Sequence, residues 1–142
     1  PSLGLLTINA FVASRYLLVP VDASAYSYQG MVELVHSLGL CNETFDAGTE
    51  LLGIFFAKYV SNESVYKQTY EFLKEECGDR LFNTVINKST LIEQAPHYNQ
   101  TIVDYAEGSR PYEDYLNLTK EFLERIKDGQ KIHTEKQKVG AI

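Results

Sequence analysis

Three short apolar segments, separated by segments of helical periodicity, constrain the fold of this chain more than any other feature. The apolar segments cover Tyr16–Val21, Leu51–Val60 and Leu81–Ile86, and they are rich in β-branched and aromatic residues, which favour strands. Helical spacing of apolar residues occupies Gln29–Leu40, between the first two, and Val65–Cys77, between the last two. Consecutive parallel strands need a long crossover, usually a helix. The pattern therefore predicts an α/β fold in three layers, with a mostly parallel sheet and flanking helices.

The remaining segments are predicted from turn and helix signals. The opening stretch, Pro1–Asp22, combines a loop, a buried helix of about ten residues and the first strand, as expected for the second half of an α/β domain whose first half is missing. Cys41–Thr49 is predicted as a loop and Asn87–Arg110 as a long surface segment with one helical turn. A last helix is predicted from Pro111, which suits a first helical position. The predicted domain covers residues 1–126, followed by a polar, flexible tail at 127–142.

Composition limits the class of protein. The 142 residues suit one domain, and no apolar run approaches the roughly 20 residues that cross a bilayer, so a soluble protein without a membrane span is expected. The net charge of −6, from 13 basic and 19 acidic residues, argues against nucleic-acid binding by the chain as a whole and leaves only a local patch for DNA. Cys41 and Cys77 lie far apart without a Cys-x-x-Cys motif and are predicted to be reduced thiols.

The residues alone reveal no catalytic motif. His36, His97 and His133 lack the spacing of metal ligands, so no metal site is predicted. The chain has no Gly-x-x-x-x-Gly-Lys-Ser/Thr phosphate loop, and we expect it not to hydrolyse a nucleotide by itself. In parallel sheets, ligands bind beyond the carboxyl ends of the strands. Those loops are predicted at Pro20–Ser24, Ala57–Asn62 and Asn87–Leu91.

Short phrases near the predicted strands resemble a known family. The phrases occupy Pro1–Ala10, Leu18–Val21, Gly53–Phe56 and Thr84–Ile86, the last followed by Gln94–Pro96. Together they resemble the carboxyl-terminal half of the ParA/Soj partition ATPases, which belong to the MinD/ParA group of P-loop proteins with a deviant Walker A loop. The resemblance runs from residue 1 to about residue 126. It implies the C-terminal part of a P-loop NTPase fold, without the phosphate-loop half.

The resemblance also implies what the intact protein does. Pro1 would follow directly after the Walker B aspartate, and the missing half would supply that aspartate, the Walker A lysines and the Mg²⁺ ligands. ATP and Mg²⁺ would be the cofactors, held between the subunits of a homodimer, with hydrolysis stimulated by a ParB-like centromere-binding protein. This fragment would be inactive alone and would not bind the nucleotide tightly.

Three groups of site residues follow from the resemblance. A switch segment on the dimer face, sensing the γ-phosphate, corresponds to Ser2, Leu3, Gly4, Thr7 and Asn9; the alternative is a buried helix start with Asn9 as an internal hydrogen-bonder. The border of the nucleotide base corresponds to Ala57, Lys58, Asn87, Lys88 and Ser89. Relatives commonly carry Thr or Asn at Ala57 and Pro at Asn87, so backbone contact with the base is the expected mode.

Nonspecific DNA binding is the third role, and the expected residues are Lys58, Lys67 and Lys88. Two arginines that relatives place beside these loops are replaced by Asn62 and Leu91. Phosphate contacts need charge rather than a motif, so these departures weaken the DNA-binding prediction, and solvated surface charges are the alternative.

The function predicted from the resemblance is plasmid or chromosome partitioning by a ParA-type ATPase located in the cytoplasm, with association with the nucleoid as a further expectation. The alternative is a degenerate ParA-like regulatory or interaction module that dimerises without partitioning DNA. A MinD-like, membrane-associated ATPase is disfavoured because residues 129–142 contain lysines but few apolar residues.

Overall fold

The computed structural model describes residues 4–139, which form two compact units, the first ending at Lys88 and the second beginning at Ser89. The elements of the first unit, in chain order, are α1 (Leu5–Ala13), β1 (Tyr16–Val21), α2 (Ala25–Phe45), β2 (Glu50–Tyr59), α3 (Ser64–Cys77), the 3₁₀ helix η1 (Gly78–Arg80) and β3 (Leu81–Asn87). The elements of the second unit are α4 (Thr90–Gln94), the 3₁₀ helix η2 (Ala95–Tyr98), α5 (Ile102–Tyr105) and α6 (Arg110–Val139).

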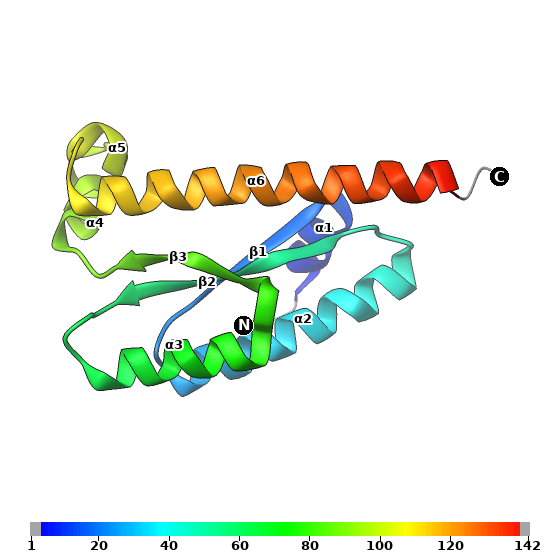
Figure 1. Ribbon diagram of the computed structural model, residues 1–142, viewed down its shortest axis with the longest axis horizontal. Coiled ribbons are helices and arrows are strands. Elements are labelled where there is room, and N and C mark those ends of the chain that lie inside the picture. The colour runs from blue at the N-terminus through cyan, green and yellow to red at the C-terminus, as the bar shows by residue number, and fades with distance from the viewer. Residues whose placement is uncertain (1–3, 140–142) are drawn as a thin grey trace. The chain divides into compact units, whose positions relative to one another are not determined.

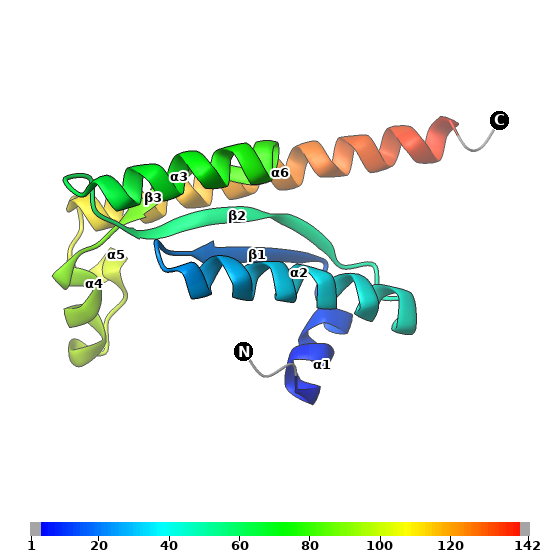
Figure 2. The ribbon, with the colours of Figure 1, turned by 90° about the horizontal axis from the view of Figure 1, so that it is seen from below.

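The first unit is built on a parallel sheet with the strand order β1-β2-β3 (Figure 1). Val19 pairs with Ile54 in the first ladder, and Tyr59 pairs with Asn87 in the second. The crossover helices α2 and α3 lie side by side on one face of the sheet (Figures 1 and 2), and the Tyr28 and Phe72 rings meet edge to face between them with centroids 5.0 Å apart. Two successive crossovers of the same hand in this strand order must cover the same face.

The core of the first unit lies between the sheet and these two helices. Alternate residues of the strands point to this face, as the period of a strand requires. Strand residues Val21 and Phe56 are 1% and 0% exposed and pack with Leu73 of α3, which is 0% exposed. The Phe56 ring also makes edge contacts with Tyr59 and Tyr70, at centroid distances of 5.6 and 6.2 Å. Burial of these side chains is the main stabilising term of the sandwich.

Gly53 is required by close packing inside the sheet. A Cβ at this position would lie 2.6 Å from the carbonyl oxygen of Arg80 and 2.6 Å from the ring of Phe82. Both neighbours belong to the entry into β3, so no side chain fits here without shifting the strand. The ladder between β1 and β2 shifts register at the same level, between Leu17 and Leu18.

The second unit consists of short helical turns followed by one long helix. Ser89 caps α4 by accepting a hydrogen bond from the Leu91 amide at 3.2 Å, and Thr101 caps α5 by accepting one from the Asp104 amide. Such hydroxyl caps satisfy amides that a helix start leaves free. The Tyr98 and Tyr105 rings stack with centroids 5.2 Å apart.

The predicted fold class is confirmed: the chain has an α/β fold with a parallel sheet and flanking helices. The first strand has the predicted bounds, and the other two agree within one residue. Among the described residues, no helix is both long and apolar enough to cross a membrane.

The predicted extent of the second helix was wrong. α2 begins at Ala25 and ends at Phe45, so much of the predicted loop Cys41–Thr49 is helical. Gly39 does not stop the helix, because buried Leu38 and Cys41 continue the apolar stripe past it, and packing outweighs the roughly 1 kcal/mol that a helical glycine costs. The helix ends instead at Asp46, which adopts the left-handed conformation with φ of 52°.

The segment after β3 also differs from its prediction. Three short helical elements, α4, η2 and α5, replace the single turn expected in a surface loop. The last helix begins one residue before Pro111 and continues to Val139. The backbone is thus helical in most of the segment predicted as a tail, while the flexibility of that tail stays a prediction.

Candidate functional site

A cavity of about 320 Å³ opens beyond the carboxyl ends of β1 and β2, where a parallel sheet of this kind places its ligands. We call it the strand-end pocket. Its lining combines polar and charged groups with an apolar wall and consists of Asp22, Ala23, Ser24, Lys58, Glu63, Val65 and Tyr66. This volume falls at the lower end of the range of about 300–1,000 Å³ for small-molecule sites.

The floor of the strand-end pocket is an interlocked turn between β1 and α2. Oδ1 of Asp22 accepts a hydrogen bond from the Ser24 amide at 2.9 Å, and the Ser24 hydroxyl accepts one from the Ser27 amide at 3.1 Å. The Asp22 amide in turn donates to the Ser27 hydroxyl at 3.0 Å. The turn therefore satisfies the Ser27 amide in the first turn of α2 and holds the Asp22 carboxylate in one place.

The Asp22 carboxyl is kept ionised at neutral pH. Its pKa lies below the ordinary aspartate value mainly because the Ser24 amide donates to it; partial burial opposes this effect, and the Ser24 hydroxyl and the nearby Lys58 ammonium add to it. The strand-end pocket therefore presents a fixed negative charge beside a positive one. Because the pocket carries both a negative and a positive group, it can orient a polar ligand and does not select for ligands of one charge.

Lys58 occupies an unusual backbone conformation at the end of β2. Its φ of 55° is in the left-handed region, which costs a non-glycine residue about 1–2 kcal/mol. The ladder to β3 shifts register here, between Phe56 and Tyr59, and resumes where the Lys88 amide donates to the Tyr59 carbonyl at 3.0 Å. Strained residues of this kind concentrate at ligand sites, which favours a functional role for Lys58.

The residues predicted to border a nucleotide base are distributed unevenly around this pocket. Lys58 lines it, while Ala57 is half-buried in β2 beside it. Asn87 is the buried last residue of β3, and Lys88 is exposed directly after it. Ser89 belongs to the second unit, where its hydroxyl caps α4. Base contact by any of these residues stays a prediction.

The predicted switch segment is described only in part. Ser2 and Leu3 lie outside the described residues. Gly4 precedes α1, and its carbonyl accepts hydrogen bonds from the Thr7 and Ile8 amides at 3.0 and 3.2 Å. Thr7 is half-buried and Asn9 is exposed, so Asn9 is not the internal hydrogen-bonder of the alternative interpretation. The dimer-face role of these residues stays a prediction.

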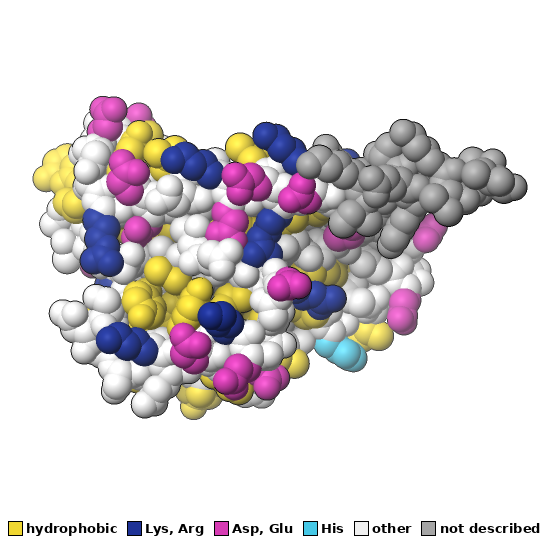
Figure 3. All heavy atoms as spheres, viewed as in Figure 1, with side chains coloured by type: hydrophobic (Ala, Val, Ile, Leu, Met, Phe, Trp, Pro, Cys, Tyr) yellow, Lys and Arg dark blue, Asp and Glu magenta, His cyan; other side chains and the backbone are white. Residues whose placement is uncertain are grey.

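The three lysines predicted to bind DNA are all exposed. Lys58 is the penultimate residue of β2 and Lys88 directly follows β3, the neighbouring strand, whereas Lys67 lies in the first turn of α3. On the face seen in Figure 3, however, basic and acidic side chains are interspersed rather than gathered by sign. This face thus offers scattered charges to a phosphate backbone.

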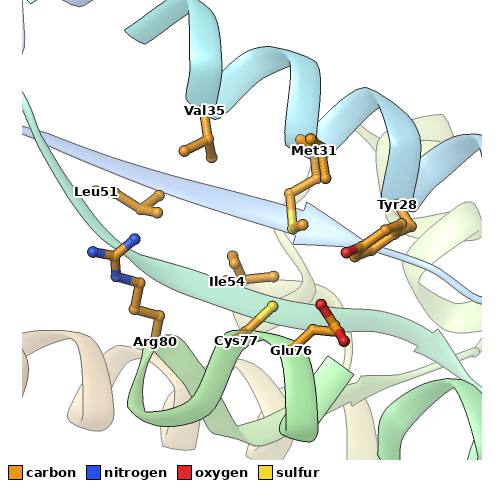
Figure 4. Close-up of a pocket in the computed structure, with 9 residues that line it drawn as sticks. Tyr28, Met31, Val35, Leu51, Ile54, Glu76, Cys77 and Arg80 are labelled. Atoms are coloured by element: carbon orange, nitrogen blue, oxygen red, sulfur yellow. The ribbon is translucent and has the colours of Figure 1, made fainter. Parts of the chain in front are cut away.

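A second cavity, also of about 320 Å³, lies between α2, β2 and α3 (Figure 4). Its inner wall is apolar, with Met31, Leu51 and Ile54, and the Cys77 thiol faces the same space. Glu76 points toward Tyr28, and Arg80 points toward Leu51. No group of three or more potential metal ligands occurs among the described residues, at this cavity or elsewhere.

The site residues predicted from the sequence did not include several residues that line the strand-end pocket. Asp22 and Ser24 lie in a loop that was predicted to face ligands, and the Asp-x-Ser spacing before a helix is a recognisable capping signal. Glu63, Val65 and Tyr66 belong to the start of α3, beyond the predicted loop, and no local pattern distinguishes them from an ordinary helix start.

Comparison with known proteins finds one matching family model and several relatives with similar names. A family model described as "AAA domain" matches residues 1–51. The chain is 31% identical over 121 residues to the sporulation initiation inhibitor protein Soj of Bacillus subtilis, a match that covers 85% of this chain and 48% of that protein. It is 30% identical over 128 residues to the chromosome-partitioning ATPase Soj of Thermus thermophilus, covering 90% of this chain and 51% of that protein.

A third relative is a ParA protein that matches a similar share of the chain. The chromosome partitioning protein ParA of Myxococcus xanthus is 26% identical over 125 residues, which cover 88% of this chain and 44% of that protein. The chain therefore spans about half the length of the curated relatives that it matches.

Proposed function

Because the chain belongs to the ParA/Soj family, we propose that it is part of a partition ATPase whose intact form binds ATP with Mg²⁺, dimerises and moves DNA cargo. Hydrolysis in the intact protein would be stimulated by a ParB-like partner. The observation that carries the proposal is the relation to Soj and ParA proteins over 85–90% of the chain. We infer a cytoplasmic location, with the protein reaching the nucleoid through its DNA contacts.

The strand-end pocket supports the base and ribose side of this proposal. Its volume of about 320 Å³ suits a purine nucleoside, and Tyr66 and Val65 supply an apolar wall for a planar ring. Lys58 and Asp22 contribute a donor and an acceptor to its lining. Backbone groups of residues 87–88 lie on the adjoining strand. ATP, when bound, supplies the phosphoanhydride that is cleaved; this chain's residues bind and orient the base.

The experiment is nucleotide binding by the intact protein, measured with a fluorescent ATP analogue. Lys58→Ala and Tyr66→Ala should each raise the dissociation constant by about tenfold, the effect expected for losing one charge-assisted hydrogen bond or the ring wall of a site. Lys74→Ala is the matched control, because Lys74 is exposed on the same helix as Tyr66 but does not line the pocket. Unchanged affinity in both pocket variants would refute the assignment of the base site.

A second candidate function is a ParA-like interaction module that dimerises without binding DNA. It is favoured by the net charge of −6 and by Asn62 and Leu91, which stand where the family resemblance predicts arginines. Electrophoretic shifts of random DNA by the ATP-loaded intact protein separate the two functions. Binding that weakens steeply with salt supports partitioning, since phosphate contacts release counterions. Absence of binding at low salt supports the interaction module.

A further inference from the structure

Helix α1 is held in the first unit mainly at its carboxyl end. Phe11 is the one residue of this nine-residue helix that is buried, and it packs with Leu38 and Cys41 of α2. Toward the amino end, Leu5 and Leu6 are 79% and 85% exposed. Figure 2 shows α1 beside the carboxyl-terminal half of α2, with its amino end directed away from the sheet. Ile8 is half-buried against the same cluster, so α1 is attached through its Ile8–Phe11 side, with Phe11 as its buried anchor.

Thr49 forms hydrogen bonds with the carboxyl end of α1. This residue precedes β2 and is 2% exposed, although its side chain is polar. Its hydroxyl lies within hydrogen-bond distance of the Phe11 carbonyl and donates to the Ser14 carbonyl at 2.7 Å. A hydroxyl has a single hydrogen, so the two carbonyls share it. The Thr49 side chain thus connects the start of β2 to the end of α1, although Thr49 and Phe11 are 38 positions apart in the chain.

Thr49 is itself held by α2. Nδ2 of Asn42 donates to the Thr49 carbonyl at 2.7 Å, and the Thr49 amide donates to Oδ1 of Asn42 at 3.3 Å. The next residue continues the connection, because the Glu50 amide donates to the Arg15 carbonyl at 2.9 Å. The backbone at Thr49 is therefore fixed before its side chain reaches α1.

The carbonyls at the end of α1 accept hydrogen bonds both from Ser14 and from Thr49. The last turn of a helix leaves its carbonyls without intrahelical donors, and a buried carbonyl without a donor is costly. α1 has no glycine to close it; the chain leaves at Ser14 in an extended conformation, with φ of −99° and ψ of 155°. The Ser14 amide donates to the Phe11 carbonyl at 3.1 Å, and the Thr49 hydroxyl adds a second donor at this end of the helix and also reaches the Ser14 carbonyl. Thr49 therefore connects the end of α1 to the start of β2.

We propose that Thr49 is a positioning residue that fixes the orientation of α1 and thereby the placement of Gly4 and Thr7, the described part of the predicted switch. The hydrogen bonds carry the positioning of α1 by themselves; its effect on nucleotide binding rests on the proposed function. Thr49 touches no predicted nucleotide contact and would act through α1.

The test uses the two cysteines as internal reporters in the intact protein. Cys41 is 5% exposed and packs with Phe11 of α1, whereas Cys77 ends α3 and packs against the other core cluster, which contains Phe56 and Leu73. Thr49→Val removes the hydroxyl and keeps the side-chain shape, and Thr49→Ser keeps the hydroxyl. Alkylation of each cysteine is followed over time by mass spectrometry of the peptide that contains it.

In Thr49→Val, the alkylation rate of Cys41 should rise roughly tenfold, as expected when one buried hydrogen bond is lost from a local opening equilibrium. The rate of Cys77 should stay within about twofold, and Thr49→Ser should restore the slow rate at Cys41. An equal rise at both cysteines, no rise at Cys41, or a Thr49→Ser variant that behaves as valine does would each overturn the inference. If Thr49→Val fails to fold, Asn42→Ala takes its place, with a smaller rise confined to Cys41.

A nucleotide titration separates this inference from the proposed function. Thr49→Val should bind the fluorescent ATP analogue several-fold more weakly than the wild type, with rescue by Thr49→Ser, because part of the binding energy must reorient α1. Unchanged affinity would overturn the positioning of the switch. If the wild-type protein binds no ATP, the proposed function fails, while the Cys41 rates still decide whether Thr49 holds α1.

Discussion

The helices α1 and α3 show that burial does not follow from hydrophobicity alone. α1 consists mostly of apolar residues, yet Phe11 is its single buried residue and Leu6 is 85% exposed. α3 is rich in Lys, Glu and Gln, yet its Leu73 is 0% exposed and its tyrosines join the aromatic cluster around Phe56. The less apolar helix is the better packed one.

Spacing explains this difference. In α3, apolar side chains recur at Tyr66, Tyr70, Leu73 and Cys77, which places them on one stripe that faces the sheet. In α1, apolar residues surround the helix, so one side packs on α2 and the others face outward. α1 thus leaves apolar side chains exposed on its outer sides, and the dimer-face role of this segment stays a prediction.

The largest effect is expected when one leucine is replaced by alanine in α3 and, for comparison, one in α1. Leu73→Ala should lower the free energy of unfolding by about 3 kcal/mol, because it opens a cavity in the core, whereas Leu6→Ala should change it by about 0.5 kcal/mol or less. Urea unfolding followed by far-ultraviolet circular dichroism measures both, since the chain contains no tryptophan. A loss at Leu6 comparable to that at Leu73 would show that α1 is packed in solution against a surface absent from this unit.

The second test concerns the thiol that ends α3. Burial raises the pKa of Cys77, the Glu76 carboxylate raises it further, and Arg80 partly offsets both. Cys77 should therefore react slowly with iodoacetamide near neutral pH, and Glu76→Gln should accelerate the reaction by about threefold by favouring the thiolate. The rate at Cys41, under α1, should not change. A rate at Cys77 that is insensitive to Glu76 would show that burial alone sets its pKa.

The smallest effect is expected at β1, which joins α1 to α2 and whose end is held by hydrogen bonds and charge. The pKa of Asp22 is lowered in the folded state, so its contribution to stability is present above the ordinary aspartate pKa of about 3.9 and is lost as the pH falls through the folded value. Asp22 is half-buried at the surface, where solvent screens its interactions, and the contribution should be about 0.5 kcal/mol or less. Asp22→Asn should remove this acid-side loss when urea midpoints at about pH 7 and pH 3 are compared. An unchanged difference would show that the Ser24 amide holds the carboxyl and the amide side chain equally well.

The sequence by itself determined which segments are strands, that these strands run parallel, and at which edge of the sheet a ligand site would lie. These depend on short-range patterns: apolar runs such as Tyr16–Val21 and helical spacing such as that of α3 are visible within a few residues. The loop Pro20–Ser24 was identified for the same reason, because parallel strands bring their carboxyl ends together. The prediction failed at Gly39, where a local stop signal was outweighed by packing at Leu38 and Cys41.

The tertiary structure alone decided which groups meet across the chain. Asp22 and Lys58 face one pocket, and Thr49 reaches the end of α1, although each pair is separated by more than thirty residues. It also decided that the mostly apolar helix α1 fully buries only Phe11 among its nine residues. Local periodicity reports which side chains could be buried, whereas actual burial depends on what other surface is available, and that is a property of the packed chain.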